Sequence, residues 1–312
     1  MSAAPPTGAA PALEATALGV AGTHGSERVR QLVSDYVELT KPKVQSLLLL
    51  TTITTMYVAG DPSPLLVFLT CLGGYLSAGG AGAVNHWFDR DIDVQMARTA
   101  TRPIPAGRIA PRSALIFGCT LALLSLLELS LTVNPLAAAL SFSGFLGYVF
   151  IYTVWLKRRT PQNIVIGGAA GAVPPLVGWA AVTGSVGGTA VILFFIVFFW
   201  TPPHFWALSL LMKEEYRKVG VPMLPVVRGE GETRRQILLY SVLLYAVTQL
   251  PFCAGGFGTI YLVSSLVLGL GFIAGAVQLY RKADRRSALR LYLFSLAYLA
   301  LLFCAMVADT HL

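Results

Sequence analysis

The sequence predicts an all-α protein that crosses a membrane nine times, and three observations carry this prediction. Hydrophobic residues make up 55% of the 312-residue chain, whereas charged residues make up only 12%. Apolar runs of about 20 residues, long enough to cross the hydrocarbon core of a bilayer, recur along the whole chain. The Lys and Arg residues fall only in alternate connections between these runs. The chain length alone allows two soluble domains, but the near-continuous runs favour one membrane domain.

The expected spans follow one another with short connections. They cover approximately residues 44–60, 64–88, 112–132, 135–156, 163–183, 189–211, 236–254, 258–280 and 288–308. We expect one membrane domain over residues 28–312, which forms a helical bundle with its functional site at the cytoplasmic mouth.

The segment before the first span has two parts. Residues 1–27 are rich in Ala, Pro, Gly and Thr, which predicts a disordered tail. No basic residue precedes an apolar core there, so a signal peptide is not expected. Apolar side chains then recur at helical spacing, which predicts a short amphipathic helix on the membrane surface. These side chains are Val29, Leu32, Val33, Tyr36 and Val37.

The positions of the basic residues predict the topology. All 23 Lys and Arg residues lie in the N-terminal region or after the second, fourth, sixth and eighth spans. By the positive-inside rule these segments are cytoplasmic, so we expect the N-terminus inside and the C-terminus outside a cell membrane. The net charge of +8 is therefore a topology signal, and it argues against a nucleic-acid-binding protein.

Asn85, Asp89 and Asp93 form the most informative pattern in the chain. They follow the apolar run 65–84, and a spacing of four places them on one face of a helix. Oxygen ligands in such a row suit Mg²⁺, which commonly binds one or two carboxylates together with substrate phosphates. Asp91 lies on the far side of the same helix and is a weaker candidate.

Two basic segments could bind an anion beside this row. Arg98 and Arg102 follow it closely, and Lys157 and Arg158 follow the fourth span. Arginine suits bidentate contacts with phosphate. The alternative is that these residues are ordinary interfacial charges that only set the topology.

Three further features lie in or after the later spans. His204 follows Pro202 and Pro203 inside a span, where an ionisable group usually faces the bundle interior. It is either a ligand-binding residue or a structural histidine. Glu215, in the connection after that span, is either functional or an ordinary interfacial charge. Pro174 and Pro175 predict a break in the fifth span, with a pocket beside it.

These segments together resemble the UbiA superfamily of intramembrane prenyltransferases over about residues 30–309. The matching segments are Asn85-x-x-x-Asp89-x-x-x-Asp93, Arg98-Thr99 to Arg102-Pro103, Lys157-Arg158 to Asn163-Ile164-Val165-Ile166-Gly167-Gly168, Pro174-Pro175, Pro203-His204-Phe205 and Pro222-Met223-Leu224-Pro225. The first segment is shared across the superfamily, whereas the Pro-His-Phe and Pro-Met-Leu-Pro segments resemble the branch that acts on haem. Other branches have a second Asp-rich repeat, and here only Glu214-Glu215-Tyr216 stands in that place.

The resemblance implies an enzyme that joins farnesyl diphosphate to haem b with Mg²⁺ as its cofactor. Asn85, Asp89 and Asp93 would hold the metal, and Arg98, Arg102, Lys157 and Arg158 would hold the diphosphate. His204 would contact haem, and Glu215 would have a catalytic role, although the branch more often has Asp at that position. The resemblance leaves open whether a downstream haem A synthase or terminal oxidase assembly is a partner.

Two other functions are compatible with parts of this pattern. The first is a prenyltransferase that acts on a quinone precursor, chlorophyllide or lipid, because such enzymes share the first motif. The second is a membrane transporter or haem carrier without catalytic activity. Polar residues are sparse along the outer halves of the spans, which disfavours a path through the membrane.

Overall fold

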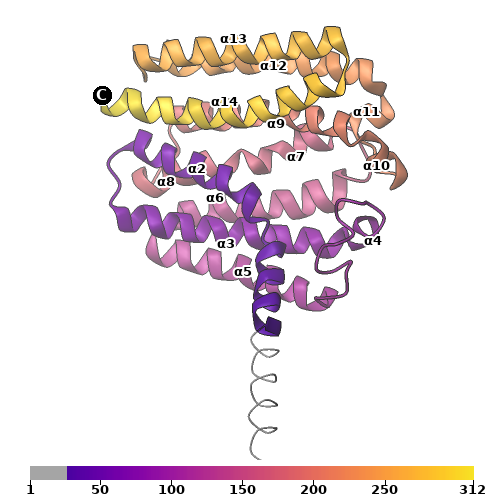
Figure 1. Cartoon of the computed structure of the whole chain (residues 1–312). Coiled ribbons are helices and arrows are strands. Elements are labelled where there is room, and N and C mark those ends of the chain that lie inside the picture. Colours follow the sequence, from indigo (N-terminus) through magenta and orange to yellow (C-terminus); the bar gives the residue numbers. More distant parts are fainter. Residues whose placement is uncertain (1–26) are drawn as a thin grey trace, which may run out of the picture.

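The computed structural model describes residues 27–312, and every regular element within that range is a helix. Long helices lie side by side across the bundle (Figure 1). They are α2 (Pro42–Ala59), α3 (Pro64–Phe88), α5 (Pro111–Thr132), α6 (Pro135–Leu146), η1 (Gly147–Leu156), α7 (Asn163–Gly171), α8 (Val173–Thr183), α9 (Gly188–Leu211), α12 (Gly229–Cys253), α13 (Thr259–Lys282) and α14 (Arg285–His311). The all-α prediction is confirmed. The tail expected at residues 1–27 falls, except for Glu27, outside the described residues.

Within residues 27–312, eight helical segments are long and apolar enough to cross a membrane, so this is a multi-pass membrane protein. Two of them combine neighbouring elements, α6 with η1 and α7 with α8. The expected first span is helix α2, which is not among the eight, so the count of nine is not confirmed as such. Four threonines and Gln45 make α2 less apolar than the other spans. Thr52 and Thr54 donate back to the carbonyl oxygens of Leu48 and Leu50, which satisfies these hydroxyls within the helix.

Glycines allow α3 and α5 to pack closely. A Cβ atom at Gly80 would lie 2.6 Å from the carbonyl oxygen of Gly118, and one at Gly118 would lie 2.8 Å from that of Gly80. Both distances are shorter than real Cβ contacts, so the two backbones can approach only because side chains are absent. This contact fixes the last turns of α3, which lead directly into the Asn85–Asp93 row.

The helix that carries this row is broken, which differs from the single continuous helix we expected. Helix α3 ends at Phe88, and the short helix α4 (Arg90–Asp93) follows. Asp89 between them has φ −85° and ψ 4°, which departs from helical geometry. The Asp93 N–H still donates to the Asp89 carbonyl oxygen at 2.8 Å, so the four-residue spacing survives the bend.

Two other irregularities lie near the same end of the bundle. Residues Gly147–Leu156 form a π-helix, and the Lys157 N–H donates to the carbonyl oxygen of Tyr152, five residues earlier. Such wide turns often occur at functional sites. The fifth span breaks at Ala172, just before Pro174, as the proline pair predicts.

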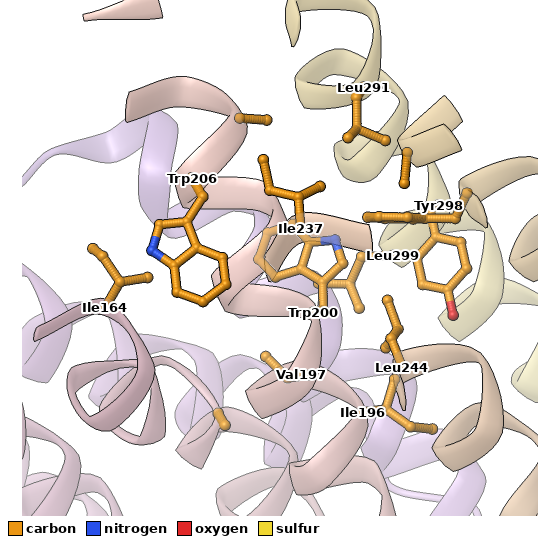
Figure 2. Close-up of a cluster of buried hydrophobic side chains, with 14 of the residues drawn as sticks. Ile164, Ile196, Val197, Trp200, Trp206, Ile237, Leu244, Leu291, Tyr298 and Leu299 are labelled. Carbon is orange, nitrogen blue, oxygen red and sulfur yellow. The ribbon is translucent and has the colours of Figure 1, made fainter. Parts of the chain in front are cut away.

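The largest apolar core lies among α9, α12, α13 and α14 (Figure 2). Trp200 of α9 is buried there, and its indole N–H donates to the carbonyl oxygen of Ser295 in α14 at 2.8 Å. Trp206, further along α9, packs edge-on against Tyr240 of α12. This core fixes the end of α9 that carries His204.

Residues 27–39 form a helix that runs across the long helices (Figure 1). Val29, Leu32, Val33 and Val37 are exposed, whereas Leu39 is fully buried. The amphipathic helix is therefore formed, and its position on the membrane surface stays a prediction. A left-handed Lys41 joins it to α2.

The close α3–α5 contact predicts a position-specific response to Gly→Ala substitutions. Gly80→Ala adds a methyl group against the Gly118 backbone and should destabilise the protein by about 1–3 kcal/mol. In Gly74→Ala, in the same helix, the added methyl group meets its nearest neighbour, the Leu49 side chain, only at 3.9 Å, so stability should be unchanged or slightly higher. Thermal unfolding in detergent measures the difference. Equal melting temperatures for the two variants would contradict this packing account.

Candidate active site

The three residues of the predicted row lie together and are almost fully buried. Asn85, Asp89 and Asp93 have exposed fractions of 3%, 1% and 3%. The Asn85 side-chain amide donates to Asp89 Oδ2 at 2.7 Å and to Thr153 Oγ1 of η1 at 3.2 Å. The row is therefore linked to the fourth span, and an amide orients one of its carboxylates.

Basic side chains from distant segments pair with both carboxylates. Lys157 Nζ contacts Asp89 Oδ2, and Arg102 Nη1 lies 2.7 Å from Asp93 Oδ2. Buried carboxylates need such partners because leaving an ionised group unpaired in an apolar environment is very costly. We expected Arg102 and Lys157 to bind a diphosphate beside the row; the structure brings both into direct contact with its carboxylates, and their role towards a diphosphate stays a prediction.

Arg158 lies at the edge of the same cluster. Its guanidinium makes two hydrogen bonds of 2.7 Å to the carboxylate of Asp91, and Nη2 lies 3.6 Å from Asp89 Oδ1. The hydrogen bonds from Arg158 hold the pKa of Asp91 below its usual value. Asp91 is 58% exposed, so it anchors Arg158 at the rim and is not part of the buried row.

Lys41 is a site residue that sequence reasoning missed. Its Nζ donates to Asn85 Oδ1 at 2.5 Å and to the Tyr148 hydroxyl at 3.4 Å. Its backbone has φ 55° and ψ 55°, a left-handed conformation that is costly for a residue with a Cβ. Burial lowers the pKa of Lys41 to about 7, and the positive charges of Arg102 and Lys157 act in the same direction.

The segment around Lys41 is built to hold this conformation. Gln45 donates to the Thr40 carbonyl oxygen at 2.5 Å, and the Thr40 hydroxyl donates to the Val37 carbonyl oxygen at 2.7 Å. In the sequence Lys41 looks like one more cytoplasmic charge. Its place directly before Pro42, where a surface helix turns into a span, was the available signal.

The donor atoms of the row fit a hard divalent cation. Asp89 Oδ1 is buried and accepts no hydrogen bond from any residue in 27–312. The described part of the chain contains no cluster of three His, Cys, Asp or Glu side chains suited to a metal. Two carboxylates and one amide would fill only part of the coordination sphere of Mg²⁺, which commonly takes its other ligands from water and substrate phosphates.

The remaining predicted residues lie apart from this contact network. Arg98 is exposed and forms no ion pair with any described residue. Glu215 is half-buried, and its Oε2 has no hydrogen-bond partner among residues 27–312. Neither residue makes a hydrogen bond or ion pair with the row. Their expected roles would therefore require contacts with a bound substrate, and both roles stay predictions.

His204 is held firmly within α9 and α14. Its ring stacks on Trp200 and Tyr292 at centroid distances of 4.3 and 4.9 Å, and Nδ1 lies 2.6 Å from Ser295 Oγ. The Ser295 hydroxyl donates to the Tyr292 carbonyl oxygen, so His204 Nδ1 carries the proton shared with Ser295. This leaves Nε2 with a lone pair in the neutral ring.

Comparison with known proteins identifies close relatives. Residues 48–302 match the UbiA prenyltransferase family. The chain is 55% identical to the protoheme IX farnesyltransferase of Chloroflexus aurantiacus over 94% of its own length and 50% of that protein. It is 54% identical to the enzyme of that name from Symbiobacterium thermophilum, over 89% of this chain and 95% of that protein. The chain thus spans about half the length of the Chloroflexus relative and of two Roseiflexus relatives, at 52% and 55% of their lengths.

Solved structures share the fold at low sequence identity. A digeranylgeranylglyceryl phosphate synthase matches with a TM-score of 0.74 and 21% identity, covering 89% of this chain and 98% of that one. A UbiA homolog from Archaeoglobus fulgidus bound to DMAPP and Mg²⁺ matches with a TM-score of 0.65 and 16% identity, covering 87% and 99%. The fold and the family match agree, and this chain belongs to the UbiA prenyltransferase family.

Proposed function

We propose that this protein transfers the farnesyl group of farnesyl diphosphate to a vinyl group of haem b, with addition of water. The products are haem O and diphosphate. The observation that carries the proposal is the buried Asn85–Asp89–Asp93 row interlocked with Lys41, Arg102 and Lys157. The assignment of haem b as the acceptor rests on the relatives, several of which are protoheme IX farnesyltransferases at 50–55% identity.

The acidic row and its basic partners provide the two halves of a diphosphate site. Asn85, Asp89 and Asp93 would hold Mg²⁺, which supplies positive charge against the diphosphate oxygens. Lys41, Arg102 and Lys157 would turn from the row to the diphosphate, with Arg98 and Arg158 at its rim. Preorganised positive charge stabilises the negative charge that builds on the leaving group as the C1–O bond breaks.

The prenyl group then leaves as an allylic cation. The electron-rich vinyl group of haem attacks this cation and forms the new C–C bond. Water adds to the resulting cation beside the porphyrin ring and loses a proton, which gives the hydroxyl group. The surrounding apolar helices limit earlier attack of water on the allylic cation. We assign His204 to contact with haem and Glu215 to orientation of the water.

We also propose a location and a unit of function. Residues 28–312 act as one membrane domain, with the N-terminus in the cytoplasm and the C-terminus outside the cell membrane. The site then opens at the cytoplasmic mouth, where water-soluble diphosphate can leave. A downstream haem A synthase or terminal oxidase assembly is a candidate recipient of the product.

Substitution of the row tests the proposed chemistry. Asp89→Asn keeps the shape of the side chain but removes its charge. Activity should fall by about 10²–10³-fold, because the metal would lose an anionic ligand and the diphosphate would lose the positive charge of that metal. Asp91→Asn, in the same segment but at the exposed rim, should have a much smaller effect. Purified protein with haem b, farnesyl diphosphate and Mg²⁺ is assayed by mass spectrometry for haem carrying farnesyl plus water.

The outcome separates the proposed function from its alternatives. Release of diphosphate without a haem product would indicate another acceptor, such as a quinone precursor, chlorophyllide or lipid. Full activity in Asp89→Asn would rule out the site proposed here. Haem movement across vesicles without any chemical change would indicate a carrier.

The low pKa of Lys41 predicts how stability changes with pH. The folded pKa of about 7 lies below the ordinary lysine value of 10.5, so between these two pH values the unfolded chain binds one more proton than the folded protein. The unfolding free energy of the wild type should therefore rise, relative to Lys41→Met, as pH increases from about 7 towards 10. Below pH 7 both states are protonated, and the difference should be constant.

Thermal unfolding of ligand-free protein in detergent from pH 6 to 10 measures this dependence. Lys43→Met is the control, because Lys43 is exposed one residue beyond Pro42 and makes no ion pair with a described residue. The difference in unfolding free energy between the wild type and Lys43→Met should not rise between pH 7 and 10. A wild-type advantage over Lys41→Met that stays flat or falls above pH 7 would contradict the assigned environment of Lys41.

A further inference from the structure

A polar pocket, separate from the acidic row, lies at the same end of the bundle. It has a volume of about 240 Å³ and lies between the start of α7, the end of α9, the short helix α11 (Leu224–Val227) and the first turns of α12. Gln162 and Trp206 line one side, and Arg228, Glu232, Gln236 and Tyr240 line the other. None of these residues takes part in the Asn85–Asp93 network.

Trp206 presents a buried donor that lacks a partner. The side chain is 2% exposed, and its indole N–H makes no hydrogen bond with any residue in 27–312. Trp200, six residues earlier in α9, has its own indole N–H paired with the carbonyl oxygen of Ser295. In Figure 2 the nitrogen of Trp206 lies on the side away from Trp200 and towards Ile164 at the start of α7. Buried indole N–H groups usually find a partner, so this one points to a missing acceptor.

Arg228 is the other side chain around the pocket that can only donate hydrogen bonds. Arg228 forms no ion pair with any carboxylate of the described chain, and Tyr240 contributes a hydroxyl group. The one carboxylate in the lining, Glu232, already accepts from Gln236 at 2.7 Å and lies 3.5 Å from Arg235. An arginine with neutral N–H and O–H donors favours a carboxylate or phosphate oxygen.

The pocket lies at the end of the bundle where the proposed porphyrin acceptor would need a site for its carboxylates. Farnesyl diphosphate places its reacting carbon beside its charged group, so the vinyl group must reach the cytoplasmic end of the bundle. The porphyrin carries two carboxylates, and these must also stay at the polar level of the membrane. Figure 1 shows α10 (Lys213–Lys218), α11 and α4 at this same end. The connection 157–162 joins the diphosphate side to the pocket.

We propose that this pocket binds a propionate carboxylate of the porphyrin acceptor through Trp206 and Arg228. This inference rests on the proposed function, since it names how the same reaction holds its second substrate. The pocket is too small for a whole macrocycle and suits a carboxylate arm with the edge of its ring. Tyr240 and Trp206 supply flat apolar surface beside the donors.

The test compares Zn protoporphyrin IX with its dimethyl ester, which keeps the ring and vinyl groups but lacks both carboxylates. Binding to purified full-length protein in zwitterionic nanodiscs is followed by porphyrin fluorescence. The wild type should bind the free acid about tenfold more tightly than the ester, as expected for charge-assisted hydrogen bonds. Trp206→Phe, which keeps an aromatic ring but loses the N–H, and Arg228→Gln should each reduce this ratio towards one.

Matched controls separate loss of the carboxylate contact from misfolding. Affinity for the dimethyl ester should be unchanged in Trp206→Phe and Arg228→Gln. Trp155→Phe, which changes an exposed tryptophan of η1, should keep the wild-type preference for the free acid. A wild type with equal affinity for both porphyrins, or variants that keep the full preference, would overturn the proposal.

The same preparation is assayed for haem O, so the two proposals can fail separately. Formation of haem O without a carboxylate preference would overturn the pocket assignment and leave the proposed function intact. A carboxylate preference that depends on Trp206 and Arg228, without any haem O, would support the pocket and contradict the farnesyl transfer. Absence of both porphyrin binding and product would overturn both.

Discussion

Burial of the Asp89 carboxylate at the end of an apolar helix is the constraint on which the rest of the site depends. The side chain is 1% exposed, and an ionised carboxylate so placed requires nearby positive charge. Lys157 comes to it from the π-helical end of the fourth span, and Asn85 bridges it to Lys41. The close α3–α5 contact, the bend at Asp89 and the left-handed Lys41 all serve this arrangement.

The balance of charge connects this constraint to the proposed chemistry. Arg102 and Lys157 pair with Asp93 and Asp89, and Lys41 contacts the amide oxygen of Asn85. With Lys41 protonated, these three cations and two carboxylates carry one excess positive charge. In the proposed site a bound Mg²⁺ would raise the excess to three, which would match a diphosphate that carries three negative charges. The basic side chains contact the carboxylates directly, and in the proposed reaction a metal–diphosphate pair would offer each group a new partner. We therefore infer that metal and diphosphate bind together.

The sequence was sufficient to predict the features that depend on periodic or local patterns. Runs of apolar residues predicted the helices, and the spacing of Asn85, Asp89 and Asp93 predicted that they lie together. The partners of these residues were predicted less well, because they depend on packing between distant segments. Arg102 and Lys157, which we expected at a neighbouring diphosphate site, make ion pairs with the row, whereas Arg98 is exposed, and its expected role stays a prediction.

Three features could not be read from the sequence for identifiable physical reasons. Lys41 has the same residue type as many interfacial charges, and only its left-handed backbone turns it towards Asn85. Thr153 reaches Asn85 because the fourth span is π-helical, which changes the register of its last turns. The pocket at Trp206 requires α9, α11 and α12 to meet, and no local pattern reports such a contact.

The most direct test of this account is whether metal binding requires the diphosphate. Mn²⁺ in place of Mg²⁺ is followed by electron paramagnetic resonance, with and without farnesyl thiodiphosphate, an analogue that reacts slowly. The account predicts weak Mn²⁺ binding to the protein alone, because Lys157 and Arg102 occupy the carboxylates, and much tighter binding once the analogue is present. Mn²⁺ binding of equal strength in both conditions would contradict the central claim that the acidic row and the basic side chains exchange partners as one unit.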